Sequence, residues 1–304
     1  MTTVFDGKKM KNEILHSVSQ KVATFSHTPL FTDILIGDDP VNAQYVAMKK
    51  KMATKLGFGY KDVAFSADTP VEKIVEEIHK LNTTPDMAGI IVQLPLPPQY
   101  NKAEILDAVD PRLDVDVLGT IASEQFYNYT GSLISKRTSD MQASLHVRES
   151  AGNTRPQPLI LPTANAVMKI LDAASVDLQT KKILILGQGP LVGKPVAHLL
   201  KKQSLLFDIV TRQTPVEEKL QLLAGADVII SAMGVPNDIA GDMIKEGVII
   251  IDAGTSEMEG SIVGDVHFES VAPKASFITP TPGGVGPVTV ACLFENVCTT
   301  ILSR

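Results

Sequence analysis

The chain has 304 residues, of which 44% are hydrophobic and 20% are charged, and its formal net charge is −6 at pH 7. A chain of this length can bury a substantial core and is long enough for two domains. Its acidic and basic residues are interspersed, without the basic cluster that binding to a phosphate backbone requires. We therefore expect no nucleic-acid partner.

The N-terminal residues lack the basic-then-apolar pattern of a signal peptide, and no apolar run approaches the roughly 20 residues that cross a bilayer. We expect a cytoplasmic protein with no membrane partner. Cys292 and Cys298 lie in an apolar segment, where buried thiols are more common than a disulfide or a nucleophile. The histidines show no ligand spacing, so we predict no metal site.

In the first half of the chain, helical and strand patterns alternate. Helices are predicted over residues 8–25, 42–56 and 71–81, and strands over residues 30–37 and 88–96. The second strand is apolar throughout, which is typical of a parallel strand covered on both faces. The first half is therefore predicted to be an α/β domain.

The second half repeats this alternation with clearer turns. Strands are predicted over residues 182–187, 207–211, 226–234, 247–254 and 276–280, and helices over residues 192–202 and 288–302. The pattern predicts two α/β domains, the second a Rossmann-like parallel sheet, with the C-terminal helix returning to the first.

The predicted domain boundaries follow from this pattern. Residues 1–145 with 284–304 form one domain, and residues 146–283 form the other. The stretch 127–158 mixes polar residues, glycine and proline without a sustained period. It is long for a connection in a compact domain, and we expect a lid, an oligomer contact or a mobile insertion.

A glycine-rich turn joins the first strand of the second half to its helix. Gly187, Gly189 and Gly193 follow a GxGxxxG spacing, with Gln188 and Val192 between them. Glycines there let the backbone approach a pyrophosphate, and the helix N-terminus adds amides and a positive dipole. The turn is a candidate nucleotide site; a tight glycine turn without a ligand is the alternative.

The end of the next strand bears on the choice between NAD and NADP. An acidic residue there would bond the ribose 2′-hydroxyl, but this segment offers Arg212 instead. Arg212 is a candidate ligand of a 2′-phosphate, which favours NADP with NAD possible; a solvated surface arginine is the alternative. Ala232 and Gly234, at the end of a later strand, are further candidates for cofactor contact.

Polar residues in the first half form a candidate substrate site. Tyr45 and Lys49 are four residues apart on one face of a predicted helix, although a solvated basic face is the alternative. Gln93 ends a buried strand, at the sheet edge where α/β proteins place ligands. Asp114 and Asp116 are two residues apart, so in an extended chain at most one points into a site.

The segment TPTPGGVGPVT, residues 279–289, combines prolines and glycines into a loop of defined shape. With Tyr45–Lys49 it belongs to a set of motifs in a fixed order across nearly the whole chain. The others are GIIVQLPLPPQYN (89–101), DVDVLG (114–119), LVGKPVAHLL (191–200) and GDVHF (264–268). Together they resemble the methylenetetrahydrofolate dehydrogenase/methenyltetrahydrofolate cyclohydrolase family, often called FolD.

The resemblance implies NADP-dependent oxidation of methylenetetrahydrofolate and hydrolysis of the methenyl product in one-carbon metabolism. It implies that Lys49 is the catalytic lysine, that Gln93 orients it, that Tyr45 stacks on the folate and that Asp116 holds the pterin. A carboxylate suits that role because it can accept two hydrogen bonds from the amino-amide edge of the pterin. The resemblance also implies a homodimer joined through the nucleotide domains.

Pro282 and Gly283 are then expected to bring backbone close to the folate and the nicotinamide, where a side chain would collide. Three positions depart from the usual family pattern. Around Thr163 the segment reads LPTANA rather than Pro-Cys-Thr-Pro-x-Gly, Gln188 stands where many members have arginine, and Val117 stands where glycine is expected. The alternatives are a monofunctional cyclohydrolase, or a folate- or nucleotide-binding protein without turnover.

Overall fold

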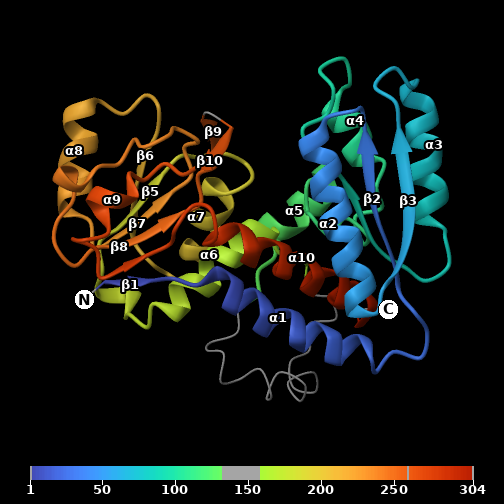
Figure 1. The fold of residues 1–304 in the computed structure, drawn as a ribbon, viewed down its shortest axis with the longest axis horizontal. Coiled ribbons are helices and arrows are strands. Elements are labelled where there is room, and N and C mark those ends of the chain that lie inside the picture. Colours follow the sequence, from blue (N-terminus) through green and yellow to red (C-terminus); the bar gives the residue numbers. More distant parts are fainter. Residues whose placement is uncertain (1, 132–157, 259, 303–304) are drawn as a thin grey trace. The chain divides into compact units, whose positions relative to one another are not determined.

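The structure, a computed structural model, describes residues 2–131, 158–258 and 260–302. These residues form two compact α/β units, each built on a parallel sheet (Figure 1). The three-stranded unit comprises Asn12–Gly131, 158–162 and 290–302, and the six-stranded unit comprises 2–11 and Thr163–Thr289. The fold class predicted from the sequence is therefore confirmed.

The three-stranded unit has the strand order β3-β2-β4, with all neighbours parallel. Its strands are β2 (Leu30–Ile36), β3 (Gly59–Phe65) and β4 (Met87–Val92). Its helices are α2 (Pro40–Leu56), α3 (Val71–Asn82), α4 (Lys102–Asp107) and α5 (Thr120–Asn128). Every residue of β4 is buried, which explains its unbroken apolar sequence.

The two faces of strand β2 have different surroundings. Ile34 and Ile36 belong to a buried core that includes Ile74 and Ile78 of α3. On the opposite face, the Phe31 ring lies 5.4 Å from the Phe294 ring. Because side chains alternate along a strand, Asp33 shares the face of Phe31, so a carboxylate stands among aromatic and aliphatic neighbours.

The six-stranded unit has the order β1-β11-β8-β7-β5-β6, and every neighbouring pair is parallel. Its strands are β1 (Thr3–Val4), β5 (Ile183–Leu186), β6 (Phe207–Val210), β7 (Val228–Ser231), β8 (Ile249–Asp252) and β11 (Phe277–Ile278). After β1, the chain re-enters this sheet at β5, moves outward to β6 and then crosses back to β7 on the other side of β5. Ligands of doubly wound sheets bind where this direction reverses, beyond the carboxyl ends of β5 and β7.

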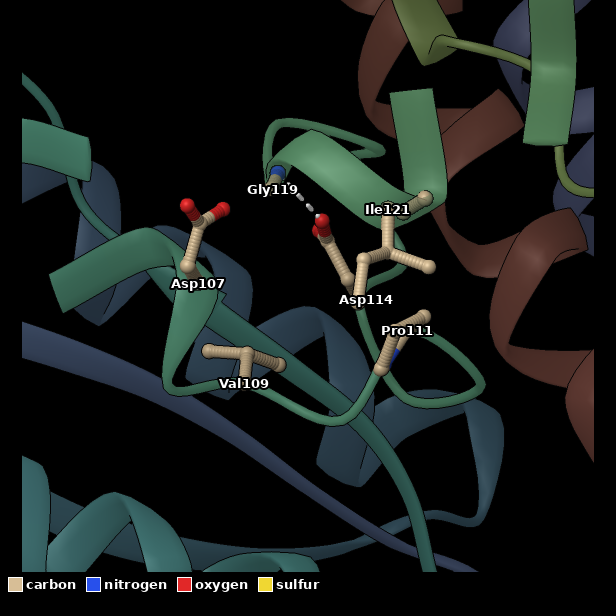
Figure 2. Close-up of a pocket in the computed structure, with 7 residues that line it drawn as sticks. Asp107, Val109, Pro111, Asp114, Gly119 and Ile121 are labelled. Atoms are coloured by element: carbon tan, nitrogen blue, oxygen red, sulfur yellow. Dashed lines mark hydrogen bonds between the residues drawn. The ribbon is translucent and has the colours of Figure 1, made fainter. Parts of the chain in front are cut away.

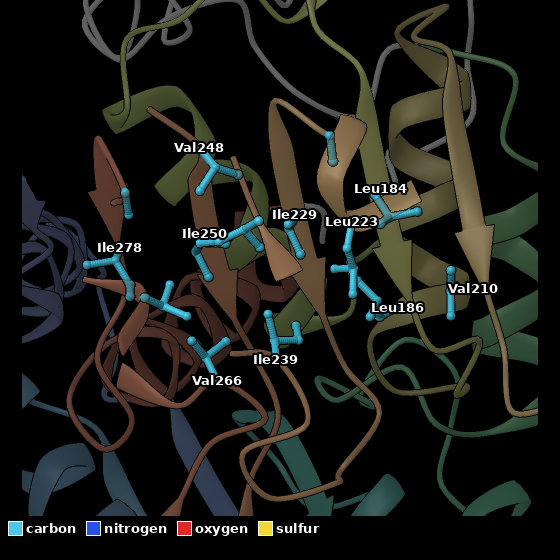
Figure 3. Close-up of a cluster of buried hydrophobic side chains, with 14 residues drawn as sticks. Leu184, Leu186, Val210, Leu223, Ile229, Ile239, Val248, Ile250, Val266 and Ile278 are labelled. Atoms are coloured by element: carbon cyan, nitrogen blue, oxygen red, sulfur yellow. The ribbon is translucent and has the colours of Figure 1, made fainter. Parts of the chain in front are cut away.

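Helices and short elements complete the six-stranded unit. The helices are α6 (Pro162–Ala173), α7 (Gly193–Lys202), α8 (Val216–Gly225) and α9 (Phe268–Val271), with the hairpin β9 (Ser256–Met258) and β10 (Ser261–Val263). Figure 3 shows the core on one face of the sheet, where alternate residues of the central strands pack together. It includes Leu184, Leu186, Ile229, Ile250 and Ile278.

Helix α1 (Gly7–Val22) and helix α10 (Val285–Leu302) each contribute residues to both units. In α10, Asn296 Nδ2 donates to the carbonyls of Val115 and Ile160, both at 2.8 Å. The C-terminal helix therefore returns to the first half of the chain, as predicted. Cys292 and Cys298 on this helix are free and buried, and burial raises the pKa of Cys298 to about 12.

Of the described helices, α10 alone is long and apolar enough to cross a bilayer by length and composition, and 56% of it is buried inside the protein. The prediction that no apolar run approaches this length was wrong for α10. Its apolar residues are explained by packing, since Val288, Phe294 and Val297 are all fully buried.

Some elements differ from the sequence-based expectation. Strand β4 ends at Val92 rather than residue 96, because the following prolines lack the N–H that a ladder needs. Strand β3 and helices α5 and α6 were not predicted. Strand β3 lies at an edge of its sheet and is only partly buried, so its apolar alternation is weak.

The N-terminal residues also differ from the expected domain division, since β1 pairs with β11 in the six-stranded sheet. Most of the stretch 127–158, for which a lid, an oligomer contact or an insertion was expected, lies outside the described residues. Of that stretch, helix α5 contains residues 127 and 128.

Candidate active site and nucleotide site

Helix α2 positions the predicted catalytic lysine. The Asp39 side chain caps its start by accepting from the Asn42 N–H, and Gly57 ends it in the left-handed conformation at φ 93°. Lys49 lies seven residues after Asn42, so both side chains lie on one helix face and both are buried. Tyr45 lies between them in sequence and is 42% exposed.

The Lys49 ammonium contacts groups from two strands of the sheet. Nζ donates to Gln93 Oε1 at 2.7 Å, just after β4, and lies 2.6 Å from Asp33 Oδ2 on β2. The Asp33 side chain is completely buried, and that of Lys49 is 11% exposed. Lys49 and Gln93 were predicted from the sequence, whereas Asp33 was not, although an acidic residue inside an apolar strand is a signal that the sequence contains.

The Gln93 amide is oriented by further hydrogen bonds. Its Nε2 donates to the Leu94 carbonyl at 2.8 Å and to Asn42 Oδ1 at 3.3 Å. Asn42 Nδ2 in turn donates to the Pro95 carbonyl at 3.1 Å. Since both Gln93 donors are used, its oxygen is directed at Lys49. Asn42 was missed as well, and its signal was the seven-residue spacing from Lys49.

The Asp114 side chain organises the turn that contains Asp116. Asp114 accepts hydrogen bonds from the backbone N–H groups of Val117, Leu118 and Gly119 at 2.7–2.9 Å. Figure 2 shows its carboxylate directed at the Gly119 amide. Burial raises the pKa of Asp114 to about 6, although these hydrogen bonds act in the opposite direction. Asp114 therefore shapes the turn rather than the ligand site.

The pocket in Figure 2, which Asp107, Pro111 and Ile121 line beside Asp114, has a volume of ≈ 10 Å³. That is room for about one water molecule. It is too small for a folate and is not the substrate site.

Asp116 follows within this turn and is half-buried. Burial raises the pKa of its carboxyl, and the nearby Lys49 ammonium acts in the opposite direction. Val117, at the position where the family usually has glycine, adopts φ 60°. A β-branched residue is strained there, so the turn keeps a glycine-like backbone at a cost of about 1–2 kcal/mol.

The glycine-rich turn that was predicted to bind the nucleotide follows β5, at the sheet edge identified above. Gly187 has φ 98°, and a Cβ on it would lie 2.5 Å from the Ala232 carbonyl oxygen. A Cβ on Gly193 would lie 2.0 Å from the Gly187 oxygen, whereas one on Gly189 meets no described atom within 4 Å. Contacts within the protein therefore require glycine at two of the three positions, and Gly189 is left open to a ligand.

The other predicted cofactor residues surround this turn. Gln188 is exposed, and Val192 is the cap residue of α7, with no side-chain hydrogen bond to the first amides of that helix among the described atoms. The Gly187 N–H donates to the Val210 carbonyl at 2.8 Å, which brings the end of β6 alongside. The exposed Arg212 lies two residues further on.

The segment after β7 contains Ala232 and Gly234. The buried Asp265, which was not predicted from the sequence, holds this segment, and the buried Asp252, also not predicted, accepts from the Asp265 amide. Asp265 accepts from the Ser231 hydroxyl at 2.6 Å and from the amides of Met233 and Val235 at 2.8 Å. Burial and the Asp265 carboxylate raise the pKa of its neighbour Asp252 to about 7. Asp265 lies in the GDVHF motif, which was identified in the sequence. The hydrogen bonds of its carboxylate to the segment after β7 were not predicted.

The remaining predicted residues lie in two other segments of this unit. Thr163 is the second residue of α6 and is half-buried. Pro282 and Gly283 precede α10; Gly283 has φ 110°, and a Cβ on it would meet no described atom within 4 Å. A side chain at Gly283 is therefore strained by the backbone, whereas one at Gly284 would collide with the Pro280 oxygen at 2.6 Å.

Comparisons with known proteins agree with these features. The catalytic domain of the tetrahydrofolate dehydrogenase/cyclohydrolase family matches residues 5–116, and the family's NAD(P)-binding domain matches residues 162–304. The bifunctional protein FolD of Lactobacillus acidophilus is 37% identical over 300 residues, which cover 98% of this chain and 96% of that protein.

Two solved structures are similar over the whole chain. The bifunctional FolD enzyme of Campylobacter jejuni has a TM-score of 0.85 and 31% identity, with 100% of both chains covered. The FolD of Trypanosoma brucei, solved with NADP and an inhibitor, has a TM-score of 0.84 and 31% identity, with 99% and 97% covered. The chain therefore belongs to the tetrahydrofolate dehydrogenase/cyclohydrolase family, the bifunctional FolD enzymes of one-carbon folate metabolism.

Proposed function

We propose that this protein oxidises 5,10-methylenetetrahydrofolate with NADP and hydrolyses the resulting 5,10-methenyl compound to 10-formyltetrahydrofolate. The observation that carries the proposal is the buried Lys49 ammonium, held 2.7 Å from Gln93 Oε1 and 2.6 Å from Asp33 Oδ2. A binding protein without turnover has no need for an ammonium fixed in this way, because burying it has a desolvation cost.

The two reactions make different demands on protons. In the oxidation, a C–H bond of the methylene bridge breaks and its hydride leaves, which gives the methenyl cation without any proton transfer; bound NADP supplies the acceptor. In the hydrolysis, water adds to the bridging carbon and the bond from that carbon to N5 breaks. N5 gains one proton and another is released, so the hydrolysis requires a group that moves protons.

Lys49 is proposed to move these protons, and Gln93 to hold its Nζ toward the substrate. Tyr45, one helical turn before Lys49 and 42% exposed, is proposed to stack on the folate. Asp116 is proposed to accept two hydrogen bonds from the amino-amide edge of the pterin.

For the cofactor, the glycine turn and the start of α7 are proposed to receive the pyrophosphate. The residues assigned to cofactor contact are Gly187, Gln188, Gly189, Val192, Gly193, Thr163, Ala232 and Gly234. The open space at Gly189 and the lack of a side-chain cap at the start of α7, among the described atoms, support this assignment. Arg212 is proposed to bind the 2′-phosphate, and the NADP in the 31% identical Trypanosoma brucei structure supports this choice.

Pro282 and Gly283 are proposed to bring backbone close to the folate and the nicotinamide. Three further proposals rest on the family resemblance and composition: a homodimer, a cytoplasmic location, and a division of labour in which the three-stranded unit binds folate.

The proposal is tested by mixing the purified protein with methylenetetrahydrofolate and NADP or NAD and following the methenyl chromophore. We expect the chromophore to appear and then decay. A protein that hydrolyses added methenyl compound but never forms it would be a monofunctional cyclohydrolase. Absence of both reactions would contradict the enzymatic proposal and leave a binding protein.

Replacement of Arg212 by serine is expected to raise the KM for NADP by about tenfold and to change the KM for NAD little, because only NADP carries the 2′-phosphate. Steady-state kinetics with each cofactor measure this difference. Lys201→Ser, which removes an exposed positive charge at the end of α7, is the control. An equal response of both cofactors to the Arg212 change would contradict the assignment.

A further inference from the structure

We propose that Asp33 is a positioning residue for the hydrolysis: it holds the Lys49 ammonium and balances its charge while the site contains the methenyl cation. This inference rests on the proposed function, since it requires that the cationic intermediate binds beside Lys49. It concerns a residue on β2 that the family motifs described above do not include.

Asp33 is buried next to the Lys49 ammonium. It lies in the middle of β2, the central strand of its sheet, and its side chain is completely buried. Its Oδ2 lies 2.6 Å from Lys49 Nζ, while Oδ1 has no hydrogen-bond partner among the described residues. A buried carboxylate without other compensation is costly, so the Lys49 ammonium is its main stabilising contact.

Two rigid supports therefore hold Nζ. Gln93 binds it from the end of β4 and Asp33 from the middle of β2, and these strands are hydrogen-bonded neighbours. Lysine has a long, flexible side chain, and two contacts from one sheet restrict where its ammonium can point. Without the Asp33 carboxylate, Gln93 alone of these two residues would hold the Lys49 ammonium.

Asp33 also balances the charge of Lys49. An unpaired ammonium would repel a cationic substrate, and the repulsion is strong where water is excluded. The Lys49–Asp33 pair is neutral as a whole, so the methenyl cation can approach Lys49 without this penalty. The methylene substrate of the oxidation binds without positive charge at its bridging carbon and acquires that charge only as the hydride leaves, whereas the hydrolysis starts from the full cation. We therefore expect the same pair to matter less for the oxidation than for the hydrolysis.

The charged and titratable groups around Asp33 come from three elements. Lys49 faces it from α2, and Asp116 acts on it from the turn between α4 and α5. On β3, the Tyr60 hydroxyl donates to the Asp33 carbonyl at 3.5 Å, and Asp62 is the register partner of Asp33. Lys50 on α2 lies over the Tyr60 ring and pairs with Asp62.

These surroundings give a pH dependence with a definite sign. Burial raises the pKa of Asp33 to about 6, Lys49 lowers it and Asp116 raises it. Asp33 is therefore ionised above about pH 6 and becomes protonated below it. As pH falls through this range the pair loses its neutrality, and hydrolysis of the methenyl cation should weaken.

The test replaces Asp33 by asparagine, which keeps the shape and removes the charge. We expect kcat/KM for hydrolysis of the methenyl cation at pH 7.5 to fall by about tenfold or more, and kcat/KM for oxidation of the methylene compound to fall by less than about threefold. In the wild type, hydrolysis should decline as pH falls below about 6, and this decline should be absent in Asp33→Asn.

Asp62→Asn is the matched control, because it makes the same change at the paired position on β3, where the side chain is 73% exposed. It should leave both reactions unchanged. If Asp33→Asn fails to fold, Asp33→Ser and the wild-type pH profile carry the test. A wild-type hydrolysis rate that is flat between about pH 5 and 7, or an equal loss of both reactions in the variant, overturns the inference.

The activity of the wild type tests the proposed function, and the comparison of wild type with Asp33→Asn tests the role of Asp33. A wild type that catalyses neither reaction overturns the proposed function. A wild type with full hydrolysis, together with an Asp33→Asn variant of unchanged rate and pH profile, overturns the role of Asp33 alone.

Discussion

Replacing Lys49 by methionine is expected to stop hydrolysis of the methenyl compound while its formation continues. Hydride transfer needs no proton transfer, whereas the hydrolysis needs a group that moves protons, and loss of such a group costs about 10²–10⁴-fold. In the coupled assay the methenyl chromophore should appear with NADP and then persist. Single-turnover measurement of its decay gives the size of the loss.

The change at Lys49 also leaves Asp33 without its ion-pair partner. Since burial already raises the pKa of Asp33 to about 6, this carboxyl can take up a proton, and we expect the variant to fold with reduced stability. Lys51→Met makes the same substitution at an exposed position of α2 and should hydrolyse normally. Normal decay of the chromophore in Lys49→Met would remove Lys49 from the reaction.

Replacing Gly193 by alanine is expected to abolish oxidation while hydrolysis of added methenyl compound continues. The new Cβ would lie 2.0 Å from the Gly187 oxygen, so the turn after β5 must move, at a cost of about 1–3 kcal/mol. The moved turn no longer presents its amides to the pyrophosphate. Lys49 and Gly193 belong to different compact units, so the hydrolytic machinery should survive.

NADP titration and thermal unfolding measure this effect. Gly225→Ala is the control, since a Cβ at that glycine meets no described atom within 4 Å, and it should bind NADP normally. Gly189→Ala tests whether glycine is needed for ligand binding rather than for folding. This variant should fold like the wild type but bind NADP more weakly than the wild type does. Normal NADP binding by Gly193→Ala would show that the turn is not the nucleotide site.

Most of the parallel strands and the helices beside the site could be predicted from local patterns. Strand β4 is an unbroken apolar run and α2 ends at a glycine in the left-handed conformation, so both were visible in sequence. The edge strand β3 was missed because a partly exposed strand carries polar residues that break the alternation. Strand β1 was missed because its pairing with β11 joins residues more than 270 positions apart.

In the candidate site, too, some residues could be predicted from local patterns and others could not. Lys49, Gln93 and Asp116 were predicted because polar residues on one helix face, at the end of a buried strand and in a turn are typical of ligand sites. The partnership of Lys49 with Asp33 could not be predicted, since it depends on how α2 packs on β2. The same holds for Asp252 and Asp265, whose positions beside one another are set by the sheet and its loops.

Local sequence patterns were thus sufficient for the α/β class, the glycine turn and the residues suited to chemistry, because helix and strand periods, caps and turns act over a few residues. Which charges face one another depended on strand order and side-chain alternation across the sheet. Asp33 lies on the face of β2 toward Lys49, and a shift of one residue in register would have moved it to the opposite face. That choice is made by packing over the whole unit, which local patterns do not contain.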